Sequence, residues 1–165
     1  TIIIGLGESI NDIEELFKLI DKYKLDRVTF YSLNPHEGTP FKKGPETEYY
    51  AKWIAKTRIN YPKLEIIAGS WVNRIEEIGT LLKCGANAFT KFPALKLFGS
   101  KYAQEIEKQV SSVNRDLKGS LTILKNINWD EAINKLNISP ERKKETIIKL
   151  KQYLKRMNLD KHKNG

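Results

Sequence analysis

The chain has 165 residues, of which 40% are hydrophobic and 30% charged, with a formal net charge of +9. This length allows one compact domain with its own core but is too short for a complete (β/α)₈ barrel, and no apolar run approaches the roughly 18 residues that a bilayer-spanning helix needs. The single cysteine, Cys84, excludes an internal disulfide and fits a reducing compartment, so we expect a cytoplasmic location and no membrane partner.

Four short apolar runs predict β-strands. The first covers residues 1–5 and is almost uninterrupted apolar, as in a parallel strand covered on both faces. The others cover residues 27–33, 64–69 and 86–92, are rich in β-branched or aromatic residues, and are mostly bounded by glycine, proline or asparagine. Because native chains seldom begin inside a strand, we expect Thr1 to continue an upstream segment.

Helical patterns separate these strands. Apolar residues at positions 13, 16, 17 and 20 predict a helix with Asn11 as its N-cap, and a second helix is predicted over residues 46–60. A third has apolar residues at 75, 78, 81 and 82, with Asn73 as its cap and Gly85 as its stop. Ser100 is the expected cap of a fourth.

Alternation of strand and helix, repeated four times, predicts the α/β class. We expect residues 1–120 to form a parallel (β/α)₄ half of a TIM-type barrel; periodicity alone does not separate this from an open doubly wound sheet. The pattern then changes to a helical basic extension over residues 121–160, with one helix near Trp129 and another capped by Ser139. Residues 161–165 are expected to be a disordered tail.

The ends of the predicted strands carry the candidate functional residues, because function in parallel barrels lies at the carboxyl ends of strands. After the first strand, glycines allow close approach of a ligand and Glu8 supplies a carboxylate, although a tight turn explains the same pattern. After the second, His36 and Glu37 could transfer protons or be exposed spectators. After the third, Trp71 could stack on a ligand or pack on a loop. Cys84 is interpreted as a buried structural thiol.

Several of these segments resemble, in order and spacing, motifs of radical S-adenosylmethionine enzymes of the biotin synthase-like branch. Residues 1–8 are similar to the G-x-I-x-G-x-x-E strand, with Thr1 in place of the first glycine. Residues 33–40 resemble the N-P-x-x-G-T-P loop, and residues 64–69 and 84–88 resemble the later A-G and G-A-N segments. The resemblance covers roughly residues 1–95, which would make them the C-terminal half of the barrel.

The resemblance implies that the full-length protein holds a [4Fe–4S] cluster on a C-x-x-x-C-x-x-C loop in an N-terminal half. With S-adenosylmethionine it would generate a 5′-deoxyadenosyl radical for hydrogen abstraction from a small-molecule substrate. The residues that would contact the cofactor by this resemblance are Ile3, Gly5, Glu8, Ser32, Leu33 and Asn34.

The resemblance also implies a substrate site, with Tyr31 and Glu65 as its candidates, and the position of Trp71 after the third strand adds that residue to them. The family's substrate-contacting asparagine is replaced by Tyr31, and its cluster-ligating arginine by Glu65, so we do not expect a biotin synthase proper. No cysteine triad is present in these residues. We therefore expect the chain alone to hold no metal and no cofactor and to be inactive without the missing N-terminal half, its main partner.

Two other functions fit parts of the sequence. A half-barrel of an aldolase or phosphate-binding TIM enzyme would share the strand–helix alternation without radical chemistry. A nucleic-acid-binding module would use the basic excess, which builds toward the C-terminus. Few aromatic residues interleave those lysines, which argues against nucleic acid as a partner.

Overall fold

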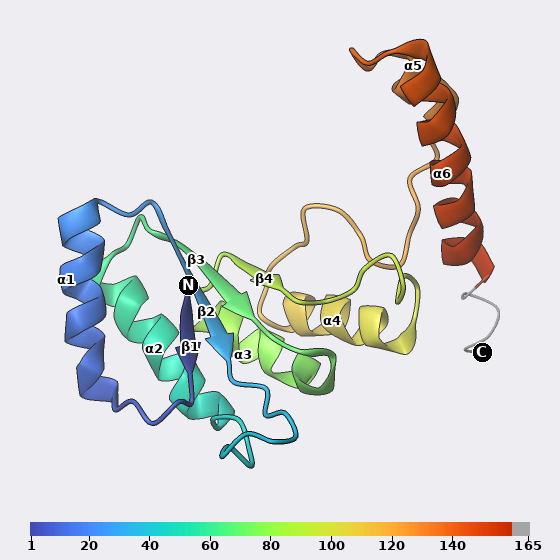
Figure 1. Ribbon diagram of the computed structural model, residues 1–165. Helices are drawn as coiled ribbons and strands as arrows, with labels where there is room; N and C mark the ends of the chain where they lie inside the picture. Colours follow the sequence, from blue (N-terminus) through green and yellow to red (C-terminus); the bar gives the residue numbers. More distant parts are fainter. Residues whose placement is uncertain (160–165) are drawn as a thin grey trace. The chain divides into compact units, whose positions relative to one another are not determined.

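The computed structural model describes residues 1–159, in which strands and helices alternate as far as the fourth helix and two further helices follow (Figure 1). The predicted tail at residues 161–165 lies outside the described residues. The elements are β1 (Ile2–Ile4), η1 (Ile10–Asp12), α1 (Ile13–Tyr23), β2 (Arg27–Ser32), α2 (Thr47–Asn60), β3 (Glu65–Gly69), η2 (Val72–Glu77), α3 (Ile78–Lys83), β4 (Ala88–Thr90), α4 (Lys101–Ser112), α5 (Trp129–Asn134) and α6 (Pro140–Leu159).

Two compact units make up the described chain. The first comprises residues 1–92 and 108–116, and the second comprises residues 93–107 and those from 117 onward. The first contains the whole sheet, whereas the second contains α5 and α6. The proposed division between barrel half and extension at residue 120 stays a prediction.

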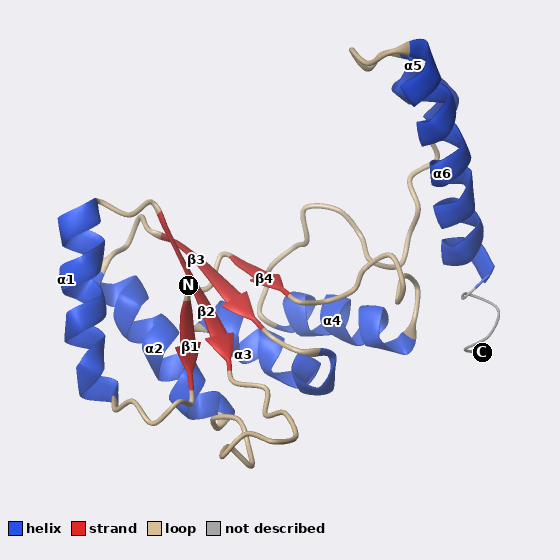
Figure 2. Ribbon diagram, viewed as in Figure 1, coloured by secondary structure: helices blue, strands red, loops and turns tan. Residues whose placement is uncertain are grey.

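The sheet has four strands, all parallel, in the order β1-β2-β3-β4 (Figure 2). This confirms the predicted α/β class with a parallel sheet and C-terminal helices. In a doubly wound sheet the strand order reverses at a switch point, whereas in a barrel each strand follows its predecessor around the sheet. The sequential order is therefore that of a half-barrel.

The two faces of the sheet differ in exposure. Residues paired across parallel strands project to the same face, so the register places Ile4, Val28, Phe30, Ile66 and Ala68 on one side. All five are at most 4% exposed, and we call this side the covered face. The opposite side, which we call the bare face, carries half-exposed or exposed side chains, including the paired residues Ile3, Tyr31 and Thr90.

Helices supply the side chains that bury the covered face. Helix α1 buries Ile13, Leu16, Phe17 and Ile20, the spacing from which the sequence predicted it. Helix α2 places Trp53 against Phe30 with ring centroids 6.4 Å apart. The fully buried hydroxyl of Tyr50 donates to the carbonyl oxygen of Phe30 at 2.8 Å. A sheet with helices on one side and bare strands on the other is what the wall of a half-barrel requires.

Two predicted caps are wrong. Asn11 lies inside η1, and the N-cap position of α1 is Asp12. Ser9 caps η1 and forms a reciprocal capping box with Asp12, whose carboxylate accepts from the Ser9 amide at 2.7 Å. Asn73 lies inside η2, a 3₁₀ segment that begins after Trp71 and displaces the start of α3 to Ile78. In both cases a 3₁₀ turn precedes the α-helix, so the first polar residue before the apolar pattern is not its cap.

The other predicted caps are confirmed. The Ser100 hydroxyl accepts from the Ala103 amide at 3.3 Å, and the Ser139 hydroxyl accepts from the Arg142 amide at 3.4 Å. Gly85, with φ of 112°, follows the end of α3. The predicted short helix near residue 129 is α5, whose cap Asn128 accepts from the Glu131 amide at 3.1 Å.

Within the second unit, one carboxylate organises the segment after α4. Glu107 accepts from the Ser120 hydroxyl at 2.8 Å, the Leu121 amide at 2.7 Å and the Thr122 hydroxyl at 2.7 Å. Burial raises the pKa of Glu107, but these hydrogen bonds outweigh it, so the pKa lies below its ordinary value. Helices α5 and α6 pack together, and the Lys143 ammonium of α6 donates a hydrogen bond to the Asn134 carbonyl oxygen of α5 at 2.6 Å.

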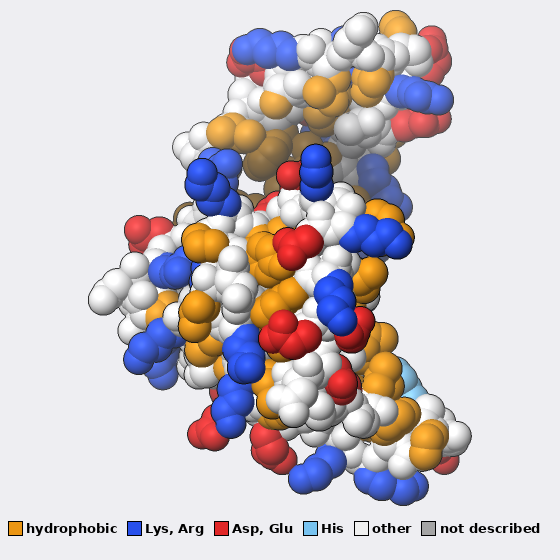
Figure 3. Space-filling model, turned by 90° about the vertical axis from the view of Figure 1, so that its left-hand side faces the viewer, with side chains coloured by type: hydrophobic (Ala, Val, Ile, Leu, Met, Phe, Trp, Pro, Cys, Tyr) orange, Lys and Arg blue, Asp and Glu red, His pale blue; other side chains and the backbone are white. Residues whose placement is uncertain are grey.

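The outer face of α1 carries charges of both signs. Figure 3 shows acidic and basic side chains interspersed with hydrophobic ones on this side of the first unit. On this face, mixed charge does not create a one-sign field of the kind that attracts nucleic acid. Within residues 1–159, no helix combines the length and the apolar composition that crossing a bilayer requires.

Strand β1 leaves one edge of the sheet unpaired within the described chain. We predict that the isolated 165-residue chain self-associates through this edge and the adjoining bare face, because unpaired strands pair with other chains. Ile3→Lys places a charge on the exposed Ile3 position and should shift the chain toward monomer in light scattering. Leu19→Lys, at a similarly exposed apolar position on α1, is the control and should not. A wild-type chain that is monodisperse and monomeric contradicts the prediction.

Candidate functional site

Three side chains gather on the bare face near the carboxyl ends of the strands. Tyr31 of β2 is in register with Gly69 of β3, which is in register with Thr90 of β4. Lys91 directly follows Thr90, and its ammonium lies 5.0 Å from the ring centroid of Tyr31 and 5.4 Å from that of Trp71. The structure therefore brings together two predicted substrate-site residues, Tyr31 and Trp71, and adds a cation.

Both rings are fixed by their neighbours. A Cβ atom at Gly69 would lie 1.9 Å from Cδ1 of Tyr31. The Tyr31 ring therefore lies directly over Gly69 and fits there only because glycine has no side chain. The indole Nε1 of Trp71 donates to the carbonyl oxygen of Ser32 at 3.0 Å. Trp71 therefore packs against the end of β2, as one of the two sequence interpretations allowed, while its ring also contacts Lys91.

Lys91 was not among the predicted site residues. Its φ is 77°, a left-handed conformation that residues other than glycine and asparagine seldom adopt. The sequence run 86–92 predicted a continuous strand, but β4 ends at Thr90. A single left-handed residue after a strand has no signature in the apolar pattern, so only the structure shows that this lysine turns toward the rings.

The segment that carries Trp71 is held by a buried carboxylate. Glu77 is 4% exposed and accepts from the Ser70 hydroxyl at 2.8 Å and from the Arg74 Nη2 at 2.6 Å. The Thr47 hydroxyl donates to the same carboxylate at 3.2 Å, which ties η2 to the start of α2. This network fixes residues 70–77, the segment that carries the indole. A hollow of about 280 Å³ adjoins it, lined by Thr47, Asn73, Arg74, Glu76 and Glu77.

The predicted cofactor residues of the first strand have unequal exposure and roles. Ile3 lies on the bare face with 45% of its surface exposed, which leaves it accessible to a ligand. The Glu8 carboxylate accepts from the Gly5 amide at 2.7 Å and the Leu6 amide at 2.8 Å. Glu8 therefore closes the turn after β1, the second of its two interpretations, and its role toward a cofactor stays a prediction.

Gly5 has a structural requirement of its own. Its φ is 110°, and an added Cβ would lie 2.9 Å from Cδ of Pro45 and 3.2 Å from Cβ of Leu33. Gly7 has the same backbone conformation, with φ of 109°, but no atom within 4 Å of such a Cβ. The two glycines thus share the strain of an added side chain but differ in crowding.

This difference gives a matched pair of variants. We expect Gly5→Ala to lower the free energy of unfolding by about 1–3 kcal/mol more than Gly7→Ala, because only the first adds an overpacking cost to the backbone strain. Urea unfolding of both variants measures the difference. Equal losses would mean that the contact with Pro45 does not require the glycine.

The residues at the end of β2 project in different directions. The Ser32 side chain lies on the covered face and is 1% exposed, so it is the main chain that could meet a cofactor, and its carbonyl oxygen already accepts from Trp71. The Leu33 amide donates to the Ile4 carbonyl oxygen at 2.9 Å. The Leu33 and Asn34 side chains are half-buried. Their contact with a cofactor stays a prediction.

Glu65 lies at the other end of the sheet. It opens β3, in register with Arg27, and its carboxylate accepts from Arg27 Nε at 2.6 Å. Four residues of strand, about 13 Å, separate its level from that of Gly69 and Tyr31. The structure thus does not bring Glu65 together with Tyr31 and Trp71, although it projects to the same face.

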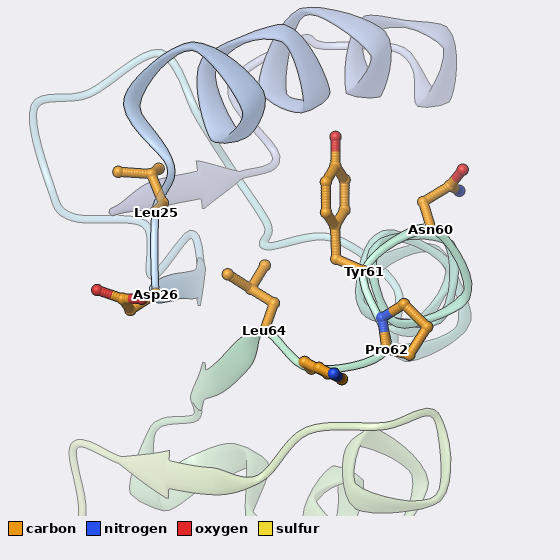
Figure 4. A pocket seen from close by; sticks show the side chains of 7 residues that line it. Leu25, Asp26, Asn60, Tyr61, Pro62 and Leu64 are labelled. Atoms are coloured by element: carbon orange, nitrogen blue, oxygen red, sulfur yellow. The ribbon is translucent and has the colours of Figure 1, made fainter.

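Other candidates lie away from these rings. His36 and Glu37 are exposed in the loop after β2. Cys84 is half-buried, not buried as predicted. A pocket of about 430 Å³ at the amino-terminal ends of β2 and β3 was not foreseen from the sequence; it is lined by Leu25, Asp26, Asn60, Tyr61, Pro62, Lys63 and Leu64 (Figure 4). Active sites of barrel enzymes lie at the opposite, carboxyl-terminal end of the strands.

The described residues do not fit an iron–sulfur cluster. Among residues 1–159, no group of three or more His, Cys, Asp or Glu side chains is arranged to hold a metal ion. Cys84 supplies one thiolate at most, whereas a [4Fe–4S] cluster needs at least three. Any such cluster must have its ligands outside these residues.

Comparison with known proteins places the chain in a family. It is 46% identical over 124 residues to the uncharacterized protein MJ0597 of Methanocaldococcus jannaschii, covering 74% of this chain and 35% of that protein. It is 32% identical over 108 residues to the biotin synthase of Clostridium tetani, covering 64% of this chain and 33% of that enzyme. The chain thus spans about a third of the length of these relatives. Residues 29–150 match the model of the Biotin and Thiamin Synthesis associated domain, and the chain belongs to that family.

Proposed function

We propose that the chain is the C-terminal, substrate-enclosing half of a radical S-adenosylmethionine enzyme of the biotin synthase-like branch. The observation that carries the proposal is the bare face of a sequentially ordered parallel sheet, with Tyr31, Trp71 and Lys91 at its carboxyl end. In a closed barrel this face lines the interior, and its carboxyl end opens into the mouth where active sites lie. The family match and the similarity to a biotin synthase support the same assignment.

The bound cofactors would supply the radical chemistry, a 5′-deoxyadenosyl radical generated from S-adenosylmethionine at a [4Fe–4S] cluster. The residues of this chain would bind and orient. Ile3 offers an exposed apolar side chain for packing against the adenine, and the main chain of residues 32–34 lies at the end of the neighbouring strand. The cluster ligands would come from the N-terminal half, since the described residues hold no set of three.

The relative lengths support a longer protein. The matched region covers only about a third of each relative, which leaves room in a protein of that size for the strands that would complete the barrel. A small-molecule substrate enclosed there would meet the two rings and the cation, while the barrel wall would exclude water from a reactive radical.

The test is made on the full-length protein encoded by the gene. Purified and reconstituted without oxygen, it should carry about four iron atoms per chain and convert S-adenosylmethionine to 5′-deoxyadenosine under reduction. The 165-residue chain, treated identically, should do neither and is the matched control. A full-length protein that acts on a substrate without iron would contradict the proposal and favour a non-radical barrel enzyme.

A further inference from the structure

Lys91 has the position of a ligand-binding residue. Its ammonium carries three hydrogen-bond donors, yet in residues 1–159 its contacts are with the rings of Tyr31 and Trp71. No acceptor oxygen of the described chain is paired with it. All three donors remain available to a group that enters from the bare face.

The backbone of Lys91 adopts a conformation that lysine disfavours. The left-handed φ of 77° costs strain, and such residues cluster at ligand sites. The two rings under the ammonium are themselves held, Tyr31 over Gly69 and Trp71 by its bond to Ser32. The cation is therefore pre-positioned by fixed neighbours, which lowers the entropy lost when a ligand binds.

At the carboxyl end of the bare face the charge is positive only. The paired side chains around Lys91 are neutral, namely Ile3, Tyr31 and Thr90, and the acid of this face, Glu65, lies at the opposite end in an ion pair with Arg27. The carboxylates of Glu8 and Glu77, which follow β1 and β3, are occupied by the turn after β1 and by Arg74. The site thus presents a cation without an acidic partner.

We propose that Lys91 binds an oxyanion, a carboxylate or a phosphate, at one end of the substrate, with Tyr31 and Trp71 flanking the bound group. The bare face continues from this point over Ile3 and Ile67, so the rest of the ligand would be apolar. The inference rests on the proposed function for the identity of the bare face as substrate space. It assigns the class of substrate, which the sequence left open.

The test uses the 165-residue chain, held monomeric by dilution so that the bare face is free, and three probes of similar shape: benzoate, phenyl phosphate and neutral benzamide. Binding is followed by the fluorescence of Trp71, taken as the difference between the chain and its Trp71→Phe variant. We expect at least one oxyanion to bind about two- to fivefold more tightly than benzamide, the effect of one exposed ion pair. The oxyanion that binds more tightly identifies the group as carboxylate or phosphate.

The variants assign the effect to one side chain. Lys91→Gln should remove the preference for oxyanions, whereas Lys91→Arg should keep it. The control is Lys83→Gln, which removes another exposed lysine of the first unit and should also keep the preference. Equal binding of all probes, no saturable binding, or a preference that survives Lys91→Gln overturns the proposal; circular dichroism confirms that the variants fold. Because this test needs no cluster, its result is independent of the iron and 5′-deoxyadenosine measurements on the full-length protein.

Discussion

Replacement of Glu77 by alanine is expected to lower the free energy of unfolding by about 3–5 kcal/mol, the cost of removing one partner from a buried ion pair. The Glu77 side chain is 2% exposed and that of Arg74 20%. Without the carboxylate, the Arg74 guanidinium and the Ser70 and Thr47 hydroxyls lose their shared acceptor. Urea unfolding followed by circular dichroism measures the change.

Glu76 provides the matched control. It is the adjacent residue, has the same side chain and is exposed, so Glu76→Ala should change the unfolding free energy by no more than about 0.5 kcal/mol. The Glu77→Ala variant should also loosen residues 70–77 and shift the emission of Trp71. A loss below about 1 kcal/mol at Glu77 would show that water replaces the carboxylate readily, against the buried network described above.

Tyr50→Phe is the second substitution with a large expected effect. The fully buried Tyr50 hydroxyl donates to the Phe30 carbonyl oxygen at 2.8 Å and lies 3.3 Å from that of Gly69, so it bridges β2 and β3. Its removal should cost about 1–3 kcal/mol at neutral pH, since buried carbonyl groups lose a donor. Tyr23→Phe, at a residue 61% exposed, should be close to neutral in the same urea unfolding experiment.

The same residue predicts a pH dependence. Burial, reinforced by the nearby Glu77 carboxylate, raises the pKa of Tyr50 above its ordinary value of 10.0. The native state therefore keeps a proton that the unfolded state releases, and stability should fall as the pH rises above about 10, by up to about 1.4 kcal/mol per pH unit. In Tyr50→Phe this alkaline decline should be shallower than in the wild type. The pKa of Tyr61, also raised, acts equally in both proteins; parallel alkaline curves would contradict the assignment.

Much of the fold follows from local pattern. Apolar runs bounded by turn residues located all four strands, and the 3.6-residue period located α1, because both signals arise from the face that each element buries. The caps at residues 11 and 73 failed because 3₁₀ turns intervene, and such turns lack an apolar period of their own. The end of β4 was placed too late because the left-handed φ of Lys91 turns the backbone out of the strand.

The candidate site was predictable only in part. Tyr31 was reached through the family resemblance and Trp71 through its position after the third strand, and the structure places both at one end of the bare face. Glu65 was grouped with them because it takes the place of the family's arginine, whereas the register with Arg27 puts it at the opposite end of the strand. Lys91 and the Glu77 network depend on contacts between segments far apart in sequence, which no local pattern encodes.

The central claim, that the bare face and the edge of β1 are closed by another half of the same protein, is tested most directly by hydrogen exchange at one amide. The Ile4 carbonyl oxygen accepts from Leu33 of the neighbouring segment, so Ile3, the alternate residue, directs its N–H to the free edge. In the 165-residue chain, held monomeric by dilution, this amide should exchange without protection; in the full-length protein it should be strongly protected. An Ile3 amide that exchanges equally fast in both proteins would contradict a barrel completed at this edge.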